Sequence, residues 1–89
     1  MMSWKIEVKP AAEKYFLKLD KNTRTRMIKA LRELENTDDP LLHPNVRALT
    51  GKLRGDFRLK VGKWRVLFTP HIEKKILYVF AIVPRGDAY

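Results

Sequence analysis

The sequence predicts an α+β fold, in which an N-terminal strand and a two-helix hairpin precede a three-stranded antiparallel meander. Apolar residues alternate with charged ones near the N-terminus and again in residues 57–68, which is typical of strands with one buried face. Between these stretches, residues 10–34 carry apolar residues at helical spacing. The order strand, helix, helix and three strands predicts a sheet with both helices packed on one face.

The composition limits the class of protein. A length of 89 residues predicts a single domain over residues 1–89. The chain has no cysteine and therefore no disulfide or thiolate zinc site, which fits a reducing cytoplasm. We expect no membrane association, because no apolar run approaches the roughly 20 residues that span a bilayer. The charged N-terminus does not resemble a signal peptide.

The net charge of +9 predicts anionic partners. Nucleic acid, acidic proteins and anionic membrane surfaces are the classes that such a field attracts. The alternative is a solvated, highly charged surface of a heat-adapted protein.

The first strand and the helices follow from local signals. Trp4, Ile6 and Val8 alternate with charged residues and predict a half-buried strand. Pro10 ends this strand and suits the first position of a helix, which we expect to run to about Leu19.

Asp20 is the expected N-cap of the second helix. That helix carries one apolar stripe, which consists of Met27, Ile28, Leu31 and Leu34. The two helices are therefore expected to form an antiparallel hairpin with a very short turn. Residues 36–40 break the second helix, and residues 37–52 are expected to be irregular. Four apolar residues are expected to hold this stretch against the core: Leu41, Leu42, Val46 and Leu49.

The hairpin in residues 57–68 carries the clearest pattern. Gly62 and Lys63 suit a two-residue turn, and pairing of Val61 with Trp64 then places Lys60 opposite Arg65. Directly opposite residues share a face of the sheet. Three cations, Arg58, Lys60 and Arg65, are therefore expected on the face away from the helices, and the alternating apolar residues on the other.

The last strand is predicted over residues 76–83, where every residue is apolar. Such a run favours an interior strand covered on both faces, and Pro84 ends it.

Residues 51–75 hold eight Lys or Arg and two Asp or Glu. A polyphosphate backbone is the natural complement of such a track. The alternative is a solvated strand face, since outward Lys and Arg commonly protect sheet edges.

No conventional catalytic motif is present. His43 and His71 lie in separate predicted loops, and the glycines lack phosphate-loop spacing. We therefore expect no cofactor and no metal. Cations can still support phosphoryl transfer, because arginine offsets charge on a phosphate. A lysine crowded by arginines releases its proton more readily and can serve as a base toward a ribose 2′-hydroxyl.

Two segments carry a resemblance to a known family: LTGKLRGDFRLKVGKWRVLF and the later IVPRGDAY. Together with the predicted element order, they resemble the RelE/ParE superfamily of toxins from prokaryotic toxin–antitoxin pairs. RelE-like members are mRNA interferases that cut message in the ribosomal A site, and ParE-like members inhibit DNA gyrase.

The resemblance implies roles for five residues. It implies base or phosphate contacts for Arg58 and Lys60, transition-state stabilisation for Arg65 and Arg85, and base stacking with proton transfer for Tyr89. Lys60 is the candidate base, because Arg58 stands where other members often have lysine and arginine keeps its charge. The Glu/His pair of some relatives is not evident. Further contacts to RNA or ribosome are expected from Lys52, Arg54, Lys63, Lys74 and Lys75.

The resemblance thus favours a ribosome-dependent, metal-independent mRNA endonuclease. It also implies an acidic antitoxin partner, which could contact exposed apolar residues of the helices such as Tyr15 and Leu17. The variant Arg65→Ala is expected to lose cleavage while it still folds and binds the antitoxin. Two alternatives stay open: a gyrase inhibitor, and an inactive family member that acts as a binding protein.

Overall fold

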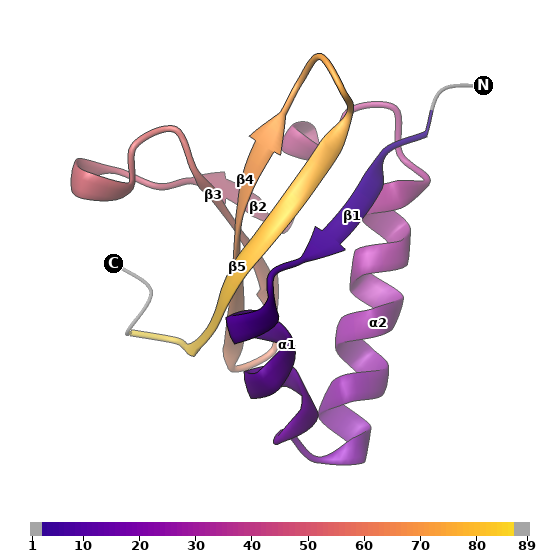
Figure 1. The fold of residues 1–89 in the computed structure, drawn as a ribbon, viewed down its shortest axis with the longest axis vertical. Helices are drawn as coiled ribbons and strands as arrows, with labels where there is room; N and C mark the ends of the chain where they lie inside the picture. The colour runs from indigo at the N-terminus through magenta and orange to yellow at the C-terminus, as the bar shows by residue number, and fades with distance from the viewer. Residues whose placement is uncertain (1–2, 87–89) are drawn as a thin grey trace.

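Five strands form one mixed sheet in the order β1-β5-β4-β3-β2 (Figure 1). The structure is a computed structural model that describes residues 3–86. Strand β1 runs parallel to β5, and all other neighbours are antiparallel. The strands are β1 (Lys5–Val8), β2 (Val46–Ala48), β3 (Phe57–Val61), β4 (Trp64–His71) and β5 (Ile76–Pro84). The predicted α+β class is confirmed.

Two helices, α1 (Pro10–Leu17) and α2 (Lys21–Glu35), cover one face of this sheet (Figure 1). Pro10 begins α1, as predicted, and the helix ends two residues before the expected Leu19. Asp20 caps α2 because its carboxylate accepts a hydrogen bond from the Thr23 backbone N–H at 3.2 Å. The Thr23 hydroxyl also donates to this carboxylate and, as the main cause, lowers the pKa of Asp20.

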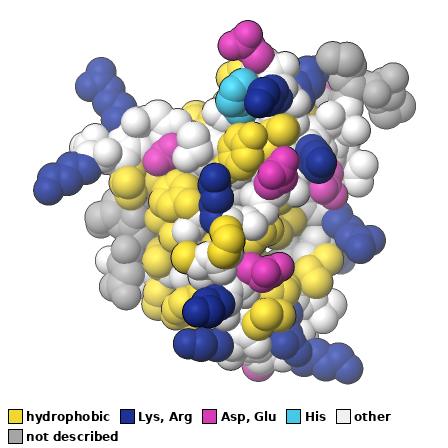
Figure 2. All heavy atoms as spheres, viewed as in Figure 1, with side chains coloured by type: hydrophobic (Ala, Val, Ile, Leu, Met, Phe, Trp, Pro, Cys, Tyr) yellow, Lys and Arg dark blue, Asp and Glu magenta, His cyan; other side chains and the backbone are white. Residues whose placement is uncertain are grey.

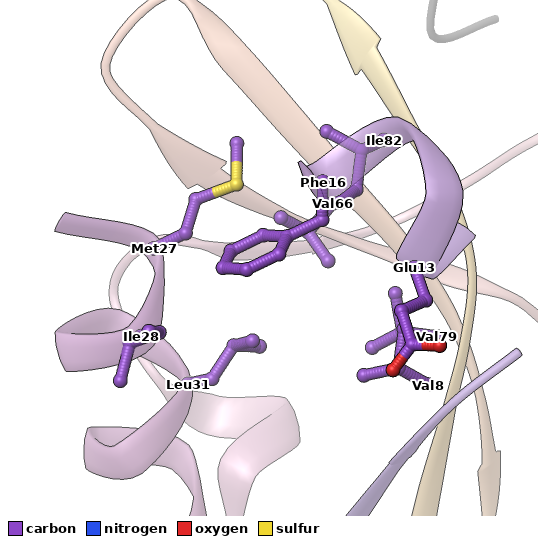
Figure 3. Close-up of a pocket in the computed structure, with 9 residues that line it drawn as sticks. All are labelled: Val8, Glu13, Phe16, Met27, Ile28, Leu31, Val66, Val79 and Ile82. Carbon is purple, nitrogen blue, oxygen red and sulfur yellow. The ribbon is translucent and has the colours of Figure 1, made fainter. Parts of the chain in front are cut away.

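An apolar pocket of about 200 Å³ opens between the two helices and the sheet. Figure 2 shows hydrophobic atoms at the centre of this side of the molecule, with charged side chains around them. Side chains from both helices and from β4 and β5 converge on the pocket (Figure 3). Its lining consists of Val8, Glu13, Phe16, Met27, Ile28, Leu31, Val66, Val79 and Ile82.

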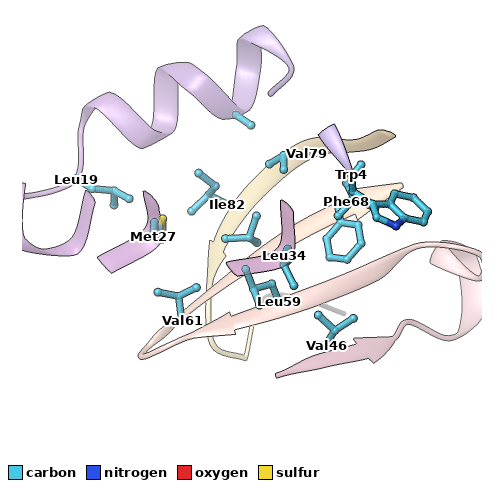
Figure 4. Packing of buried hydrophobic residues seen from close by; sticks show 13 residues of the cluster. Trp4, Leu19, Met27, Leu34, Val46, Leu59, Val61, Phe68, Val79 and Ile82 are labelled. Carbon is cyan, nitrogen blue, oxygen red and sulfur yellow. The ribbon is translucent and has the colours of Figure 1, made fainter. Parts of the chain in front are cut away.

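The main core lies between α2 and the sheet (Figure 4). Met27 and Leu34 from the predicted apolar stripe are fully buried, whereas Ile28 is 42% exposed. The alternate residues Leu59, Val66 and Phe68 of β3 and β4 meet them from the sheet. Burial of these side chains supplies most of the driving force for folding.

Residues 37–56 are more regular than the sequence suggested. They contain the 3-10 helices η1 (Pro40–Leu42) and η2 (Gly51–Leu53), and strand β2, which pairs with β3. Val46 and Leu49 are buried, as expected. The expectation that Leu42 contacts the core is wrong: it is 80% exposed, because η1 turns its side chain outward.

The second face of the sheet carries its own small core. Leu49 and Leu67 are buried there. They are packed by half-buried residues of η2 and β5, namely Leu53, Phe80, Ala81 and Val83. Interior strand β5 is therefore apolar toward both faces, as its sequence predicted. The face away from the helices thus combines apolar residues with the cations that were expected there.

Candidate functional site

The β3–β4 hairpin has the predicted register. Val61 pairs with Trp64, Lys60 with Arg65 and Arg58 with Leu67 across the turn at Gly62 and Lys63. Gly62 has a φ of 60°, which glycine adopts without strain. The period of two therefore places Lys60 and Arg65 side by side on the second face, at the end of the sheet where the turn lies.

Arg65 is buried beneath this turn, with 6% of its surface exposed. Its Nη1 donates hydrogen bonds to the carbonyl oxygens of Gly62, at 3.0 Å, and Trp64, at 2.9 Å. The guanidinium therefore satisfies backbone acceptors of its own hairpin. The sequence placed Arg65 on a cationic face but gave no sign of this burial, which results from packing around β4.

Lys60, Lys63 and Arg85 are the exposed cations at this end of the sheet. The Arg85 N–H donates to the Lys63 carbonyl oxygen at 2.7 Å, which holds the segment after β5 against the hairpin turn. Lys63, Pro84 and Arg85 line an open hollow of about 400 Å³. Arg65 lies on β4 between the other two strands, with Lys60 on β3 and Val83 on β5 as its cross-strand neighbours.

Arg58 lies further along β3 and is half-buried. Its Nη1 donates to the Asn45 carbonyl oxygen at 3.4 Å, and its cross-strand partner on β2 is Arg47. The Arg47 guanidinium is turned away to the carbonyl oxygens of Pro44 and Val46, each at 3.1 Å. These backbone bonds explain how two arginines occupy opposite positions despite their like charge.

The other predicted RNA contacts are spread over the molecule. Lys52 and Arg54 are exposed on and directly after η2, the loop that projects from the sheet in Figure 1. Lys74 and Lys75 lie in the β4–β5 turn, at the opposite end of β4 from Lys63. Tyr89 lies outside the described residues. The structure therefore groups only Lys63 of this set with Lys60 and Arg85.

One Glu/His pair was not predicted from the sequence. His43, after η1, places Nε2 3.4 Å from the Glu33 carboxylate on α2, and its Nδ1 accepts the Asn45 N–H at 3.1 Å. Both ring nitrogens are engaged, so the pair ties the loop after η1 to α2. Ten residues separate Glu33 from His43, and no local pattern signals their contact. Within residues 3–86, no cluster of three or more His, Asp or Glu residues could hold a metal ion.

Comparison with known families gives a match over nearly the whole chain. Residues 6–89 match the family model described as the ParE toxin of the type II toxin–antitoxin system parDE. No curated protein matches the chain. Among residues 3–86, no helix is both long and apolar enough to cross a membrane.

Solved structures show that this fold occurs in related toxins. The chain is similar to a structure of the archaeal RelE–RelB complex from Pyrococcus horikoshii, with 23% identity, 98% and 100% of the two chains covered, and a TM-score of 0.78. It is similar to a RelE mutant of E. coli in the free state, with 20% identity, 98% and 88% coverage, and a TM-score of 0.77. It is also similar to a YoeB/ParE toxin from Agrobacterium tumefaciens, with 13% identity, 91% and 98% of the two chains covered, and a TM-score of 0.75.

Proposed function

Because the chain belongs to the ParE toxin family of type II toxin–antitoxin systems, within the RelE/ParE superfamily, we propose that it acts as a ribosome-dependent mRNA endonuclease. It would cut message in the ribosomal A site in the cytoplasm, without a metal ion. We treat residues 1–89 as one functional domain that carries both the RNA site and the surface for its antitoxin.

The observation that supports this proposal is the gathering of Lys60, Lys63 and Arg85 around one end of the sheet. Exposed cations that are fixed on strands and a turn can hold a phosphodiester in one orientation. Lys60 is the candidate base, because an amine can lose a proton and a guanidinium cannot.

The proposed reaction is an in-line transfer. Lys60 removes the proton of a ribose 2′-hydroxyl, and the resulting oxyanion attacks the adjacent phosphorus. The bond from phosphorus to the 5′-oxygen of the next nucleotide breaks, which leaves a 2′,3′-cyclic phosphate. Arg85 offsets the charge that develops on the phosphate oxygens. Tyr89 is proposed to stack on a base and return a proton to the leaving oxygen.

The roles of Arg58 and Arg65 change in this proposal. The Arg65 Nη1 is occupied by two turn carbonyls, so we assign Arg65 to positioning the turn and to the positive field beneath Lys60. Arg58 lies two residues from Lys60 on the same face of β3 and is assigned a phosphate contact. Lys52 and Arg54 on η2 are assigned contacts to RNA outside the cleavage site.

A gyrase inhibitor is the second candidate function. The match to a family model named for ParE favours it, as does the engagement of Arg65 by its own backbone. Such an inhibitor needs no base, and therefore tolerates replacement of Lys60.

The test is primer extension on a translated message after expression of the wild type and of Lys60→Ala, Lys60→Arg and Arg85→Ala. We expect cleavage to be lost in all three, because arginine at position 60 keeps the charge but cannot accept the proton. Lys5→Ala is the matched control, since Lys5 is an exposed lysine on β1, at the other edge of the sheet, and is assigned no RNA contact. Full cleavage by Lys60→Arg would refute the base assignment. DNA damage signalling with uncut message would favour the gyrase inhibitor.

An acidic antitoxin is the proposed protein partner. The structures from Pyrococcus horikoshii and Mycobacterium tuberculosis are toxin–antitoxin complexes. In this chain, Tyr15 and Leu17 are 40% and 60% exposed on α1 and flank Phe16, which lines the apolar pocket between the helices. An amphipathic segment with acidic flanks would match both the apolar pocket and the net charge of +9.

A further inference from the structure

A second basic hollow lies on the helix side of the β3–β4 turn. It has a volume of about 320 Å³ and is lined by Arg26, Lys29, Ala30, Glu33, Asn45, Lys60, Val61 and Gly62. Four of these residues occupy one side of α2, because positions 26, 29, 30 and 33 follow helical spacing. The others come from the end of β3, the turn and the loop before β2. The small side chain of Ala30 leaves room for the hollow beside the strand.

Arg26 is held close to the turn of the candidate active site. A Cβ atom placed on Gly62 would lie 3.1 Å from Nη2 and 3.3 Å from Nη1 of Arg26. The guanidinium therefore rests against the bare backbone of Gly62. A side chain at this position would require the guanidinium to shift by a few tenths of an ångström, so the turn that presents Lys63 lies in close contact with an arginine from α2.

The cations of this hollow have no acidic partner among the described residues. Arg26, Lys29 and Lys60 form no salt bridge within residues 3–86. Glu33 is the one carboxylate that lines the hollow, and it lies 3.4 Å from Nε2 of His43. Three exposed cations thus face one carboxylate around the hollow, which leaves it with a net positive charge, and such an arrangement attracts a phosphate.

We infer that this hollow binds a backbone phosphate of the single-stranded RNA whose cleavage is proposed above, next to the nucleotide that is cut. The inference rests on that proposed function, because Lys60, the candidate base on β3, also lines the hollow. RNA would cross the end of β3, with one phosphate between Arg26 and Lys29 and the next at Lys60 and Arg85. A single strand suits this path better than a duplex, because the route bends from the helix side of the sheet to its second face.

The test is binding of a fluorescently labelled 2′-O-methyl RNA dodecamer, measured by anisotropy at several salt concentrations. This probe has no free 2′-hydroxyl and cannot be cleaved by the proposed reaction, so binding is measured apart from chemistry. The variant Arg26→Ala/Lys29→Ala removes two charges from the hollow. The matched control Lys14→Ala/Lys18→Ala removes two exposed lysines from the region of α1. Thermal unfolding by circular dichroism verifies that both variants are folded.

We expect the hollow variant to bind several-fold more weakly, and its plot of log affinity against log salt to be shallower by about 0.7, the value for one phosphate on a single strand. Equal behaviour of the hollow and control variants would overturn the inference. A loss confined to a DNA duplex of the same length would also overturn it and would assign the hollow to DNA. If the wild type cuts no message while the hollow variant still loses RNA affinity, the cleavage proposal fails and the phosphate site stands.

Discussion

Arg65 places a buried positive charge under the turn that presents Lys63. Its Nη1 donates to the carbonyl oxygens of Gly62 and Trp64 in partly buried hydrogen bonds, and a carbonyl that loses its donor in such a place is costly. The residue therefore contributes to the shape of the site as well as to its charge. Because of this dual role, we expect replacement of Arg65 to change the stability of the protein before any effect on RNA cleavage can be interpreted.

We predict that Arg65→Ala lowers the free energy of unfolding by about 1–3 kcal/mol, because two acceptors lose their donor and the side chain leaves a void. Urea denaturation of the purified protein measures this loss. Lys63→Ala is the control, since Lys63 is an exposed neighbour on the same turn. An Arg65→Ala protein as stable as wild type would show that water or another group replaces the guanidinium, and would return Arg65 to a purely electrostatic role.

The β3–β4 hairpin is the element whose structure was predicted most accurately from the sequence. Alternation of apolar residues and the Gly62-Lys63 turn are local signals, and the observed register follows from them without knowledge of the rest of the chain. The burial of Arg65 has no such local signal; one of its cross-strand neighbours, Val83 on β5, packs in the second core. Leu49 and Leu53, from the segment before β3, pack with Leu67 in the second core. The sequence of that segment has no periodicity that predicts this contact.

The same distinction explains the other differences. Strand β2 is three residues long and forms by pairing with β3, so its own sequence carries too short a pattern. Leu42 and Val46 are equally apolar, but η1 directs Leu42 to solvent and the pairing of β2 buries Val46. The contact of Arg26 with Gly62 joins a helix and a turn that are 36 residues apart, and only the fold reveals it.

Gly62 has a positive φ and also lies against the Arg26 guanidinium. We predict that Gly62→Ala destabilises the protein by about 1–2 kcal/mol, because its φ of 60° is strained for alanine. Gly51→Ala is a matched control: Gly51 has a φ of 68° but nothing within 4 Å of the position of a new Cβ atom. Both variants should lose stability in urea. Gly62→Ala should also weaken RNA binding in the wild-type background but not in Arg26→Ala, because its methyl group would shift the Arg26 guanidinium by a few tenths of an ångström; an equal loss of RNA affinity in both backgrounds would contradict this contact.

At the scale of the whole molecule, two separate surfaces are proposed for two kinds of partner. The apolar pocket opens between α1 and α2, whereas Lys63 and Arg85 lie at the end of the hairpin and of β5. The net charge of +9 acts over both, so an acidic antitoxin would be drawn to the protein from any direction. An antitoxin held by the pocket could then cover the cationic end or leave it open.

This separation leads to a kinetic prediction for the complex with the acidic antitoxin. We expect the association rate constant to fall by at least about tenfold between low and high salt, because long-range attraction by the +9 charge is screened. The dissociation rate constant should change little with salt, because it depends on short-range apolar contacts at the pocket. Surface plasmon resonance over a salt series measures both constants.

Variants of the two surfaces should separate these effects. Ile28→Ser places a hydroxyl at the rim of the pocket, where Ile28 is 42% exposed, and should speed dissociation while the salt dependence of association is unchanged. Lys14→Ala/Lys18→Ala lowers the net charge by two and should slow association at low salt without altering dissociation. If Ile28→Ser left the dissociation rate unchanged, the antitoxin would have to bind elsewhere, and the cationic end of the sheet would be the surface to examine next. If association were insensitive to salt, the charge of this toxin would serve RNA alone.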